Sequence, residues 1–333
     1  MTNRILVIQT ASIGDVILAT PVVEKLHRHF PGSAIDLLVK KGNESLFAGH
    51  PFLHEVLVWD KRSRSTPNFI RLMRQVRRNR YSLVVNLQRF FKTGLMTAFS
   101  GAAMTIGFDK NPLSFLFTKK IAHTLDGIHE IYRNLSLVEA ITGEGACMPR
   151  LYPSAPDAAH VAPFNAGIYY TLSPASLWFT KQYPLEKWVD LIKQVPVDSH
   201  IYLLGAGNDH ELCAEIMAKA AHPNARNLAG KLTFLQSAAL MQHAAMNFTN
   251  DSAPMHLASA VNAPVTAIYC STIPGFGFGP LSDDSAVVEM DHPLPCRPCG
   301  LHGYRSCPEK HFRCGYEIRN EQLTSRLLHN INP

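Results

Sequence analysis

The sequence predicts an α/β protein built from two Rossmann-like domains, each with an open parallel sheet. The chain has 333 residues, whereas a typical domain has roughly 100–200. In both halves, short apolar runs alternate with amphipathic segments, which is the pattern of βα units. Prolines gather between Met148 and Phe164, which indicates a linker. We therefore place one domain at 1–155 and the other at 156–333, and leave open whether the last helix packs back on the first domain.

Five apolar runs predict the strands of the first domain. They are Arg4–Thr10, Ala34–Val39, Glu55–Asp60, Ser82–Gln88 and Met104–Phe108. A helix is expected over Asp15–Phe30, because the Pro-Gly pair that follows would end it. Another helix opens at Thr66, which caps it and is followed by Pro67 in the first helical position.

The same alternation restarts after the linker. The predicted strands are Ile168–Pro174, His200–Leu204, Met246–Thr249 and Pro264–Cys270, and the predicted helices are Leu185–Gln194, Asp209–Ala221 and one that begins at Ala253. A further helix begins after Thr233, which forms a capping box with Gln236. Ligands of open α/β sheets bind just outside the carboxyl ends of the strands. We therefore expect the two domains to face a cleft, with the functional residues in the loops that follow the strands.

Composition excludes several classes of protein. With 46% hydrophobic and 17% charged residues, the chain is neither disordered nor fibrous. No stretch of about 18 apolar residues is free of polar interruptions, which excludes a membrane span. The apolar run Ile5–Ile8 is shorter than the roughly 7–15 residues of a secretory signal. We therefore expect a cytoplasmic protein.

Positive charge concentrates in the first half of the chain. Residues 1–150 contain 20 Lys and Arg against 11 Asp and Glu, a balance of +9, while the rest contains 12 against 15, a balance of −3. The residues that supply most of the excess are Lys61, Arg62, Arg64, Arg71, Arg74, Arg77, Arg78 and Arg80. A solvated helix face explains such a run as well as a surface for a polyanion, which could be nucleic acid, anionic lipid headgroups or a phosphorylated glycan.

The first strand leads into Gly14 and Asp15, which begin the next helix. Glycine permits the tight turn at this point. Asp15 is either a helix cap that favours the dipole or a carboxylate placed to act as a general base. The loop has neither the G-x-G-x-x-G pattern of dinucleotide binding nor the G-x-x-x-x-G-K-[ST] phosphate loop, so an NAD enzyme and an NTPase are both disfavoured.

Two loops of the second domain carry residue types that bind phosphate. Thr180 and Lys181 suit an anionic ligand such as a diphosphate, although a solvated loop lysine is the plain alternative. Gly205 opens a glycine-rich turn that lets a nucleotide approach backbone N–H groups.

The strongest of these signals lies between a strand and the helix that begins at Ala253. Asp251 and Ser252 occupy that turn, where Ser252 and the backbone N–H groups of the helix can bind phosphate. His256 follows one helical turn later, and a packed core histidine is its alternative interpretation.

In combination, these motifs resemble glycosyltransferase family 9, the ADP-heptose:lipopolysaccharide heptosyltransferases. The resemblance covers roughly residues 4–275 and rests on Gln9–Asp15 with Thr20-Pro21, Thr180-Lys181, Gly205–Glu211, Asn250–Ser252 and Met255–Ala258. The residues of these motifs are most similar to those of the heptosyltransferase II type. One difference is that Ala253 and Pro254 follow Ser252, where the family often has a glycine after the Asp-Ser/Thr pair.

The resemblance implies a two-domain GT-B fold, with the acceptor on the first domain and the ADP-sugar on the second. It implies an inverting transfer of L-glycero-D-manno-heptose from ADP-heptose to the inner core of lipopolysaccharide, without a catalytic metal or another required cofactor. Asp15 matches the family's proposed base and Lys181 the lysine that contacts the diphosphate, so both are assigned to catalysis. The residues assigned to the donor are Ser12, Thr180, Gly205, Asp251, Ser252 and His256.

The implied partners are an ADP-sugar donor and a phosphorylated, lipid-linked glycan acceptor, without nucleic acid. Lys61, Arg62 and Arg64 then become candidate contacts for acceptor phosphates or for the cytoplasmic face of the inner membrane, on which the protein would be peripheral. Two alternatives stay open, a transferase that uses another nucleotide sugar and a non-catalytic nucleotide-sugar-binding protein of the same fold.

Four of the seven cysteines fall within nineteen residues, at Cys296, Cys299, Cys307 and Cys314. Disulfides are the weaker explanation in a reducing cytoplasm. Four thiolates can hold a structural zinc ion or an iron–sulfur cluster, and reduced thiols in an ordered loop are the equal alternative. The basic residues among them are too few and too spread out for a zinc ribbon that binds nucleic acid.

Overall fold

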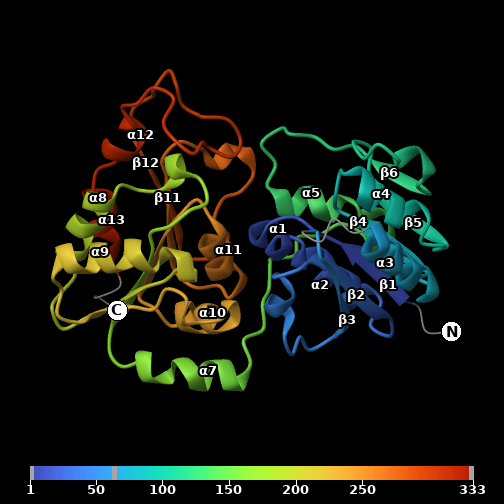
Figure 1. The fold of residues 1–333 in the computed structure, drawn as a ribbon, viewed down its shortest axis with the longest axis horizontal. Coiled ribbons are helices and arrows are strands. Elements are labelled where there is room, and N and C mark those ends of the chain that lie inside the picture. The colour runs from blue at the N-terminus through green and yellow to red at the C-terminus, as the bar shows by residue number, and fades with distance from the viewer. Residues whose placement is uncertain (1–3, 62–65, 330–333) are drawn as a thin grey trace. The chain divides into compact units, whose positions relative to one another are not determined.

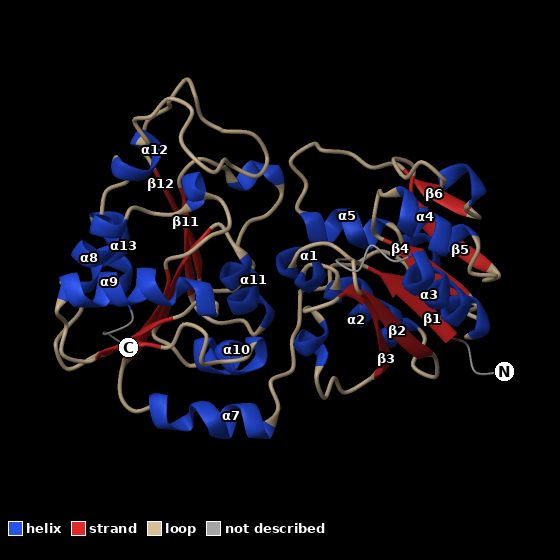
Figure 2. Cartoon of the chain, in the orientation of Figure 1, coloured by secondary structure: helices blue, strands red, loops and turns tan. Residues whose placement is uncertain are grey.

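The computed structural model describes residues 4–61 and 66–329 and contains two compact units, Met1–Tyr152 and Pro153–Pro333 (Figure 1). Each unit holds a six-stranded sheet in which every neighbouring pair of strands is parallel. Figure 2 shows helices packed around the sheet of each unit. The predicted fold class, α/β with two Rossmann-like open sheets, is therefore confirmed.

The first unit contains all five strands predicted for it and one more. Its strands are β1 (Arg4–Ile8), β2 (Ala34–Lys40), β3 (Leu53–Trp59), β4 (Leu83–Asn86), β5 (Met104–Phe108) and β6 (Lys119–Ile121). Its helices are α1 (Ile13–Ile17), α2 (Thr20–His29), α3 (Thr66–Arg78), α4 (Phe91–Ala98), α5 (Glu130–Ser136) and α6 (Glu139–Thr142), with 3-10 helices at Glu44–Phe47 and Ser114–Leu116. The sequence did not predict β6, whose three residues include two lysines.

The second unit repeats this organisation. Its strands are β7 (Tyr169–Ser173), β8 (His200–Leu203), β9 (Ala225–Asn227), β10 (Met246–Asn250), β11 (Val265–Tyr269) and β12 (Ser285–Glu289). Its helices are α7 (Ala155–Val161), α8 (Leu185–Ile192), α9 (His210–Ala220), α10 (Phe234–Gln242), α11 (Ala253–Ala260), α12 (Arg313–Tyr316) and α13 (Glu321–His329), with 3-10 helices at Ala162–Phe164, Phe179–Lys181, Gly207–Asp209 and Pro274–Phe276. Within the described ranges, no helix is both long and apolar enough to cross a membrane.

Two predicted segments were wrong in detail. The helix expected over Asp15–Phe30 is divided into α1 and α2, because Pro21 has no N–H to donate to the Ile17 carbonyl. The hydroxyl of Thr20 bonds that carbonyl instead, at 2.7 Å. The segment expected to be a linker contains α7, because Ser154 and Asp157 form a capping box at its start.

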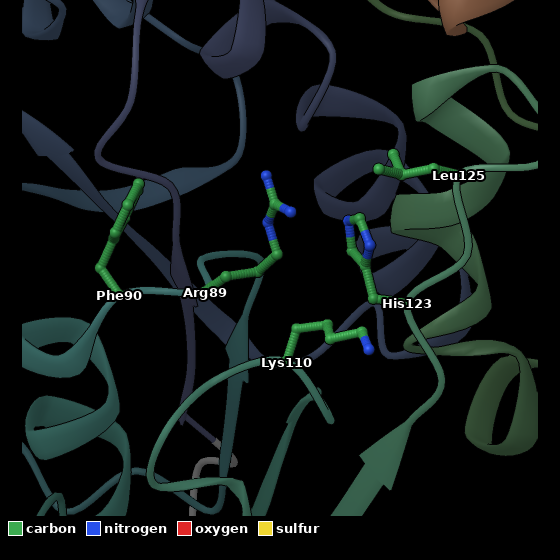
Figure 3. A pocket seen from close by; sticks show the side chains of 5 residues that line it. All are labelled: Arg89, Phe90, Lys110, His123 and Leu125. Carbon is green, nitrogen blue, oxygen red and sulfur yellow. The ribbon is translucent and has the colours of Figure 1, made fainter.

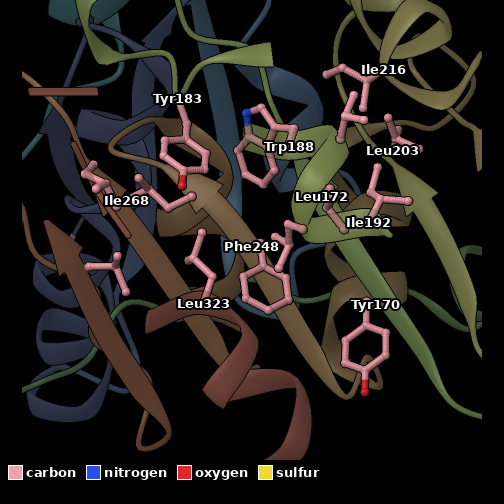
Figure 4. Packing of buried hydrophobic residues seen from close by; sticks show 14 of the residues in the cluster. Tyr170, Leu172, Tyr183, Trp188, Ile192, Leu203, Ile216, Phe248, Ile268 and Leu323 are labelled. Carbon is pink, nitrogen blue, oxygen red and sulfur yellow. The ribbon is translucent and has the colours of Figure 1, made fainter. Parts of the chain in front are cut away.

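The core of the second unit explains how its last helix is held. Leu323 and Leu327 of α13 are buried in the same cluster as Phe248 of β10 and Trp188 of α8 (Figure 4). The Tyr170 hydroxyl on β7 also donates to the Leu327 carbonyl at 3.2 Å. The buried leucines of α13 therefore belong to the second unit's own core.

Strand order determines where each sheet can hold a ligand. The first sheet runs β3-β2-β1-β4-β5-β6 and the second β12-β11-β10-β7-β8-β9. The chain order reverses between β1 and β4 in one sheet and between β7 and β10 in the other. Open α/β sheets bind ligands beside the carboxyl ends of the strands at such a reversal. The loops that follow these four strands are therefore the expected ligand-binding positions.

Candidate functional site

Asp15 lies in the first turn of α1, just after β1, and is half-buried. Its Oδ2 accepts hydrogen bonds from the Ser12 N–H at 3.1 Å and from the Ser12 hydroxyl. Among the described residues, no group donates a hydrogen bond to Oδ1. Asp15 therefore caps its helix with one oxygen and keeps the other available, so the two roles considered for it are compatible. The donor role predicted for Ser12 stays a prediction.

A second carboxyl group lies close enough to Asp15 to be affected by its charge. Glu130 begins α5 and pairs with Arg133, and their side chains are 13% and 4% exposed. Burial raises the pKa of Glu130 to about 7 against the opposing charge of Arg133, and the charge of Asp15 adds to the rise. The first unit thus places a readily protonated carboxyl group near Asp15.

Lys61 lies at the same edge of the first sheet. Its amino group donates a 2.6 Å hydrogen bond to the Thr10 carbonyl, just past β1. Burial lowers the pKa of Lys61, and the charges of Lys40 and Lys92 lower it further. Several cations therefore gather where β1, β2 and β3 end. The other predicted basic residues, Arg62 and Arg64, lie outside the described residues.

The ends of β4, β5 and β6 form a cationic pocket. Its volume is about 550 Å³, and it is lined by Arg89, Phe90, Lys110, His123 and Leu125. Figure 3 shows that the side chains of Arg89, Lys110 and His123 come from separate loops and lie around one space. Three nitrogen-bearing groups from three strand ends suit an anionic ligand better than a neutral one.

The histidine of this pocket is neutral at physiological pH. Burial lowers the pKa of His123 to about 4, and the nearby charges of Arg89 and Arg133 lower it further. The positive charge of the pocket therefore comes from Arg89 and Lys110. An anion that entered would favour the protonated imidazole and so draw a proton to His123.

The second unit contains an ion pair at its strand reversal. The Lys181 amino group lies 2.7 Å from Asp251 Oδ2, and the two side chains are 14% and 8% exposed. Lys181 ends the 3-10 helix that follows β7, and Asp251 follows β10, which is the neighbour of β7 in the sheet. The Thr272 hydroxyl, just past β11, donates to the same carboxylate oxygen at 2.6 Å. Three strand ends thus converge on one carboxylate.

Asn250 and Thr180 hold the backbone around this pair. The Asn250 amide, at the end of β10, donates to the Pro174 carbonyl at 2.8 Å and accepts from the Tyr183 N–H at 2.9 Å. Thr180 is buried, and its hydroxyl accepts a 2.7 Å hydrogen bond from the Tyr304 N–H. The hydroxyl of Thr180 is therefore occupied by the protein in this structure.

The other predicted donor residues lie on the same unit. Gly205 begins the turn after β8, and a Cβ there would lie 2.8 Å from Asp209 Cβ, so the turn requires glycine. Ser252 is half-buried at the N-cap of α11, where its side chain makes no capping hydrogen bond. His256 is 5% exposed on α11, as expected for a packed helix histidine. Their roles toward a ligand stay predictions.

The four clustered cysteines are free thiols, and Cys314 is the buried one among them. Burial raises the pKa of Cys314 to about 12, and the neighbouring sulfurs of Cys299 and Cys307 add to the rise. Cys296 Sγ lies 3.9 Å from His311 Nε2. The sulfurs are therefore neighbours, but in the part of the chain that the structure describes no three of them lie within 4.8 Å of one another.

The tightest group of possible metal ligands among the described residues is Asp36, His54 and Glu55. A cation already occupies this group, because the Arg4 guanidinium lies 2.8 Å from Asp36 and 2.9 Å from Glu55. The Tyr81 hydroxyl donates to Asp36 at 2.6 Å, and burial raises the tyrosine's pKa. This group is an internal ion network near the starts of β1 and β3, away from the carboxyl ends of the strands.

Sequence reasoning missed Arg89, Lys110, His123 and Thr272. Arg89 directly follows a predicted strand and Lys110 lies two residues after another, so the rule that ligands bind at strand ends would have found them. His123 follows β6, a strand that the sequence did not reveal. Thr272 belongs to no sequence motif. Its importance depends on β11 lying close to β10 in the folded sheet.

Comparisons with known proteins show which family and which solved fold this chain resembles. The model of "Glycosyltransferase family 9 (heptosyltransferase)" matches residues 69–304. "Lipopolysaccharide heptosyltransferase 3" of Escherichia coli is 26% identical over 276 residues, which cover 78% of this chain and 81% of the relative. "Lipopolysaccharide heptosyltransferase 2" of Escherichia coli K12 is 23% identical, and the match covers 99% of this chain and 97% of the relative's length. The structure of E. coli ADP-heptose lps heptosyltransferase II has a TM-score of 0.80 at 22% identity, with 98% of each chain covered, and shares the GT-B fold.

The pocket geometry predicts how His123 titrates. In the free protein we expect its imidazole pKa near 4. Saturating phosphate should raise that pKa by about one to three units, because an anion in the pocket stabilises the charged form. Histidine NMR titrations with and without phosphate, assigned with His123→Gln, measure this shift.

His50 is the matched control for this titration. Burial lowers its pKa to about 4 as well, with His27 adding to the effect. It packs edge-on against Tyr152 rather than in the pocket. A His123 pKa that phosphate leaves unchanged, or that shifts only as much as that of His50, would contradict an anion site.

Proposed function

This chain belongs to glycosyltransferase family 9, and we propose from that premise that it transfers L-glycero-D-manno-heptose from ADP-heptose to the inner core of lipopolysaccharide. The observation that carries the proposal is the Lys181–Asp251 pair at the strand reversal of the second sheet. Relatives named as lipopolysaccharide heptosyltransferases match 78% and 99% of the chain. The pair supplies the cation that a departing diphosphate requires.

The donor binds the second unit in this proposal. ADP is already a good leaving group, so the site has to stabilise the negative charge that develops on the diphosphate. Lys181, the Ser252 hydroxyl and the Ala253 N–H at the start of α11 are suited to that task, whereas Pro254 has no N–H and the Met255 N–H donates to the Ser252 carbonyl at 3.1 Å. Asp251 is then available to accept hydrogen bonds from sugar hydroxyls beside the lysine.

The acceptor binds the first unit. Asp15 Oδ1 takes the proton of the acceptor hydroxyl, whose oxygen attacks the anomeric carbon from the face opposite ADP, so the configuration inverts. Arg89 and Lys110 in the cationic pocket bind anionic groups of a phosphorylated glycan. The reaction needs both units, because the base lies on one and the diphosphate site on the other.

Removing the base should separate chemistry from donor binding. We expect Asp15→Asn to lower turnover by roughly 10²–10⁴-fold, which is the usual contribution of a positioned base. The affinity for ADP should stay within about twofold, because Asp15 is not part of the donor site. Steady-state rates with ADP-heptose and a heptose-deficient lipopolysaccharide, together with calorimetric titration of ADP, measure both quantities.

Asp60→Asn is the control for this experiment. Asp60 follows β3 at the same edge of the sheet and pairs with Lys41 at 2.9 Å, so its loss should leave turnover close to that of the wild type. If Asp15→Asn kept more than about a third of wild-type turnover, Asp15 would be only a helix cap.

We further propose that α3 contacts an anionic membrane surface. Arg71, Arg74 and Arg78 are exposed on the helix face opposite the buried Leu72 and Val76. Among the described residues these arginines form no salt bridge. Three unpaired cations on one helix face are suited to anionic lipid headgroups, and the acceptor is itself lipid-linked.

Charge reversal on α3 should abolish binding to anionic vesicles. Each basic residue near such a surface contributes about 1 kcal/mol, so Arg71→Glu/Arg74→Glu/Arg78→Glu should weaken partitioning by at least about 100-fold. Cosedimentation with phosphatidylglycerol vesicles, against neutral phosphatidylcholine vesicles, measures it.

The control variant must change the net charge by the same amount. Lys193→Glu/Arg226→Glu/Lys231→Glu does so, because it reverses three exposed cations of the second unit. Equal loss of vesicle binding in the two triple variants would contradict a role specific to α3, as would unchanged binding in the α3 variant.

We also propose that Cys296, Cys299, Cys307 and Cys314 hold a structural metal ion, zinc or iron. Their spacing offers four thiolates, and the short Cys296–His311 contact shows how closely this segment is folded. Tetrahedral zinc requires sulfurs only roughly 3.8 Å apart, so ion binding would draw these neighbours together. Four protein ligands leave no open position, so the ion would take no part in the transfer.

Metal content tests this site directly. Protein purified without a metal-binding tag should contain roughly one ion per chain, and Cys299→Ser/Cys307→Ser should lose it while Cys147→Ser, a buried cysteine of the first unit, keeps it. Chelation should lower the melting temperature, because metal binding is coupled to local folding, and leave early turnover intact. Metal content far below one per chain, with the half-buried thiols of Cys296, Cys299 and Cys307 reactive in the native protein, would exclude the site.

A further inference from the structure

The segment that carries the clustered cysteines, residues 296–314 (the cysteine segment), packs directly on the residues around Lys181. The Tyr304 N–H donates to the Thr180 hydroxyl at 2.7 Å, and the Thr180 N–H donates to the Tyr304 carbonyl at 3.1 Å. The Cys299 N–H donates to the Ser271 carbonyl at 2.8 Å, and the Ser271 N–H donates to the Thr180 carbonyl at 3.2 Å. The residue before Lys181 is therefore bonded on both sides, to the end of β11 and to the cysteine segment.

Arg297 ties the same segment to the loop that orients Asp251. Its guanidinium donates to the carbonyls of Cys270 at 2.8 Å and Thr272 at 2.7 Å, and it pairs with Glu289 at 2.5 Å. Its side chain is 11% exposed. Arg297 thus holds the backbone of Thr272, and the side-chain hydroxyl of the same threonine donates to Asp251. A chain of contacts thus runs from Arg297 through Thr272 to the Lys181–Asp251 pair.

Gly303 leaves the space that the stem of Lys181 occupies. A Cβ at Gly303 would lie 2.8 Å from Thr180 Oγ1 and 3.1 Å from Lys181 Cγ. At φ +75°, the residue also adopts a conformation that suits glycine. Gly300, in the same segment, has a similar φ of +67°, but the nearest atom to a Cβ there is the Tyr304 hydroxyl at 3.7 Å. The two glycines differ mainly in their distance from Lys181.

We propose that Gly303 and Arg297 are positioning residues for the Lys181–Asp251 pair, so that the cysteine segment determines where the lysine amino group meets the donor diphosphate. In this role both residues act through Lys181 or Asp251 rather than on the ligand itself. The proposal rests on the proposed function, because it takes ADP as the ligand of Lys181. It gives the cysteine segment a role in donor binding that its cysteines alone do not suggest.

Calorimetric titration of ADP into the full-length protein tests the role of Gly303. We expect Gly303→Ala to weaken ADP binding by about 10-fold, the loss expected when one charged hydrogen bond is displaced. Gly300→Ala introduces the same methyl group at a similar φ, away from Lys181, and should stay within about twofold of the wild type. Melting temperatures of both variants show whether the fold is retained.

A double-mutant cycle shows whether the effect passes through Lys181. In the Lys181→Ala background, Gly303→Ala should change ADP affinity by less than about twofold, because the group it displaces is already absent. Wild-type ADP affinity in Gly303→Ala, or the same loss with and without Lys181, would overturn the inference. Wild-type ADP affinity in Lys181→Ala would instead overturn the proposed donor site, so the two failures are distinguishable.

Arg297→Lys provides a second, independent variant should Gly303→Ala fail to fold. Lysine keeps the positive charge but cannot donate to two carbonyls and a carboxylate in a fixed fork. We expect ADP binding at least about fivefold weaker, and again no further loss in the Lys181→Ala background. Wild-type ADP affinity in Arg297→Lys would overturn the role of Arg297. If Gly303→Ala is also folded and also binds ADP like the wild type, the role of the whole cysteine segment is overturned.

Discussion

The ion pair between Lys181 and Asp251 is the contact on which the second unit's site depends. Two charges this far from water are stable only when each is fully partnered. Asp251 gains a second donor from Thr272, and the backbone beside Lys181 is fixed by Asn250 and Thr180. In the proposed function, a diphosphate that binds here would replace Asp251 as the anionic partner of the lysine. Its affinity is therefore a difference between two electrostatic interactions, which explains why the geometry of the pair has to be held so closely.

We propose that the two units use the same strand order for different tasks. In the first sheet, cations follow several strands, at Lys61, Arg89 and Lys110, and Asp15 follows the central strand β1. In the second unit the cation at the strand reversal, Lys181, is paired in advance with a carboxylate. The uneven charge of the chain, +9 in residues 1–150 and −3 in the rest, follows this division. In that proposal an acceptor with several negative charges and a single diphosphate bind surfaces of different kinds, and the same topology provides one in each unit.

Local sequence rules predicted the elements that carry the site better than the contacts within it. Apolar runs such as Ile5–Ile8 revealed the central strands, because buried parallel strands are continuously hydrophobic. Asp15, Lys181 and Asp251 could be named because each follows such a strand. The division of the helix at Pro21 and the helix inside the proline-rich segment were missed, since both depend on single capping contacts. Thr272, Arg297 and Gly303 were out of reach for another reason, because their partners are distant in sequence and only folding brings them together.

We propose that this chain moves a heptose from ADP-heptose to lipopolysaccharide. The decisive measurement is nucleotide release by the wild-type protein from ADP-heptose, UDP-glucose and GDP-mannose, each with and without a heptose-deficient lipopolysaccharide acceptor. We expect that only ADP-heptose is consumed, that consumption depends on the acceptor, and that mass spectrometry finds the acceptor heavier by one heptose. Acceptor-dependent turnover of another nucleotide sugar in place of ADP-heptose, or no turnover with any of them, would contradict it.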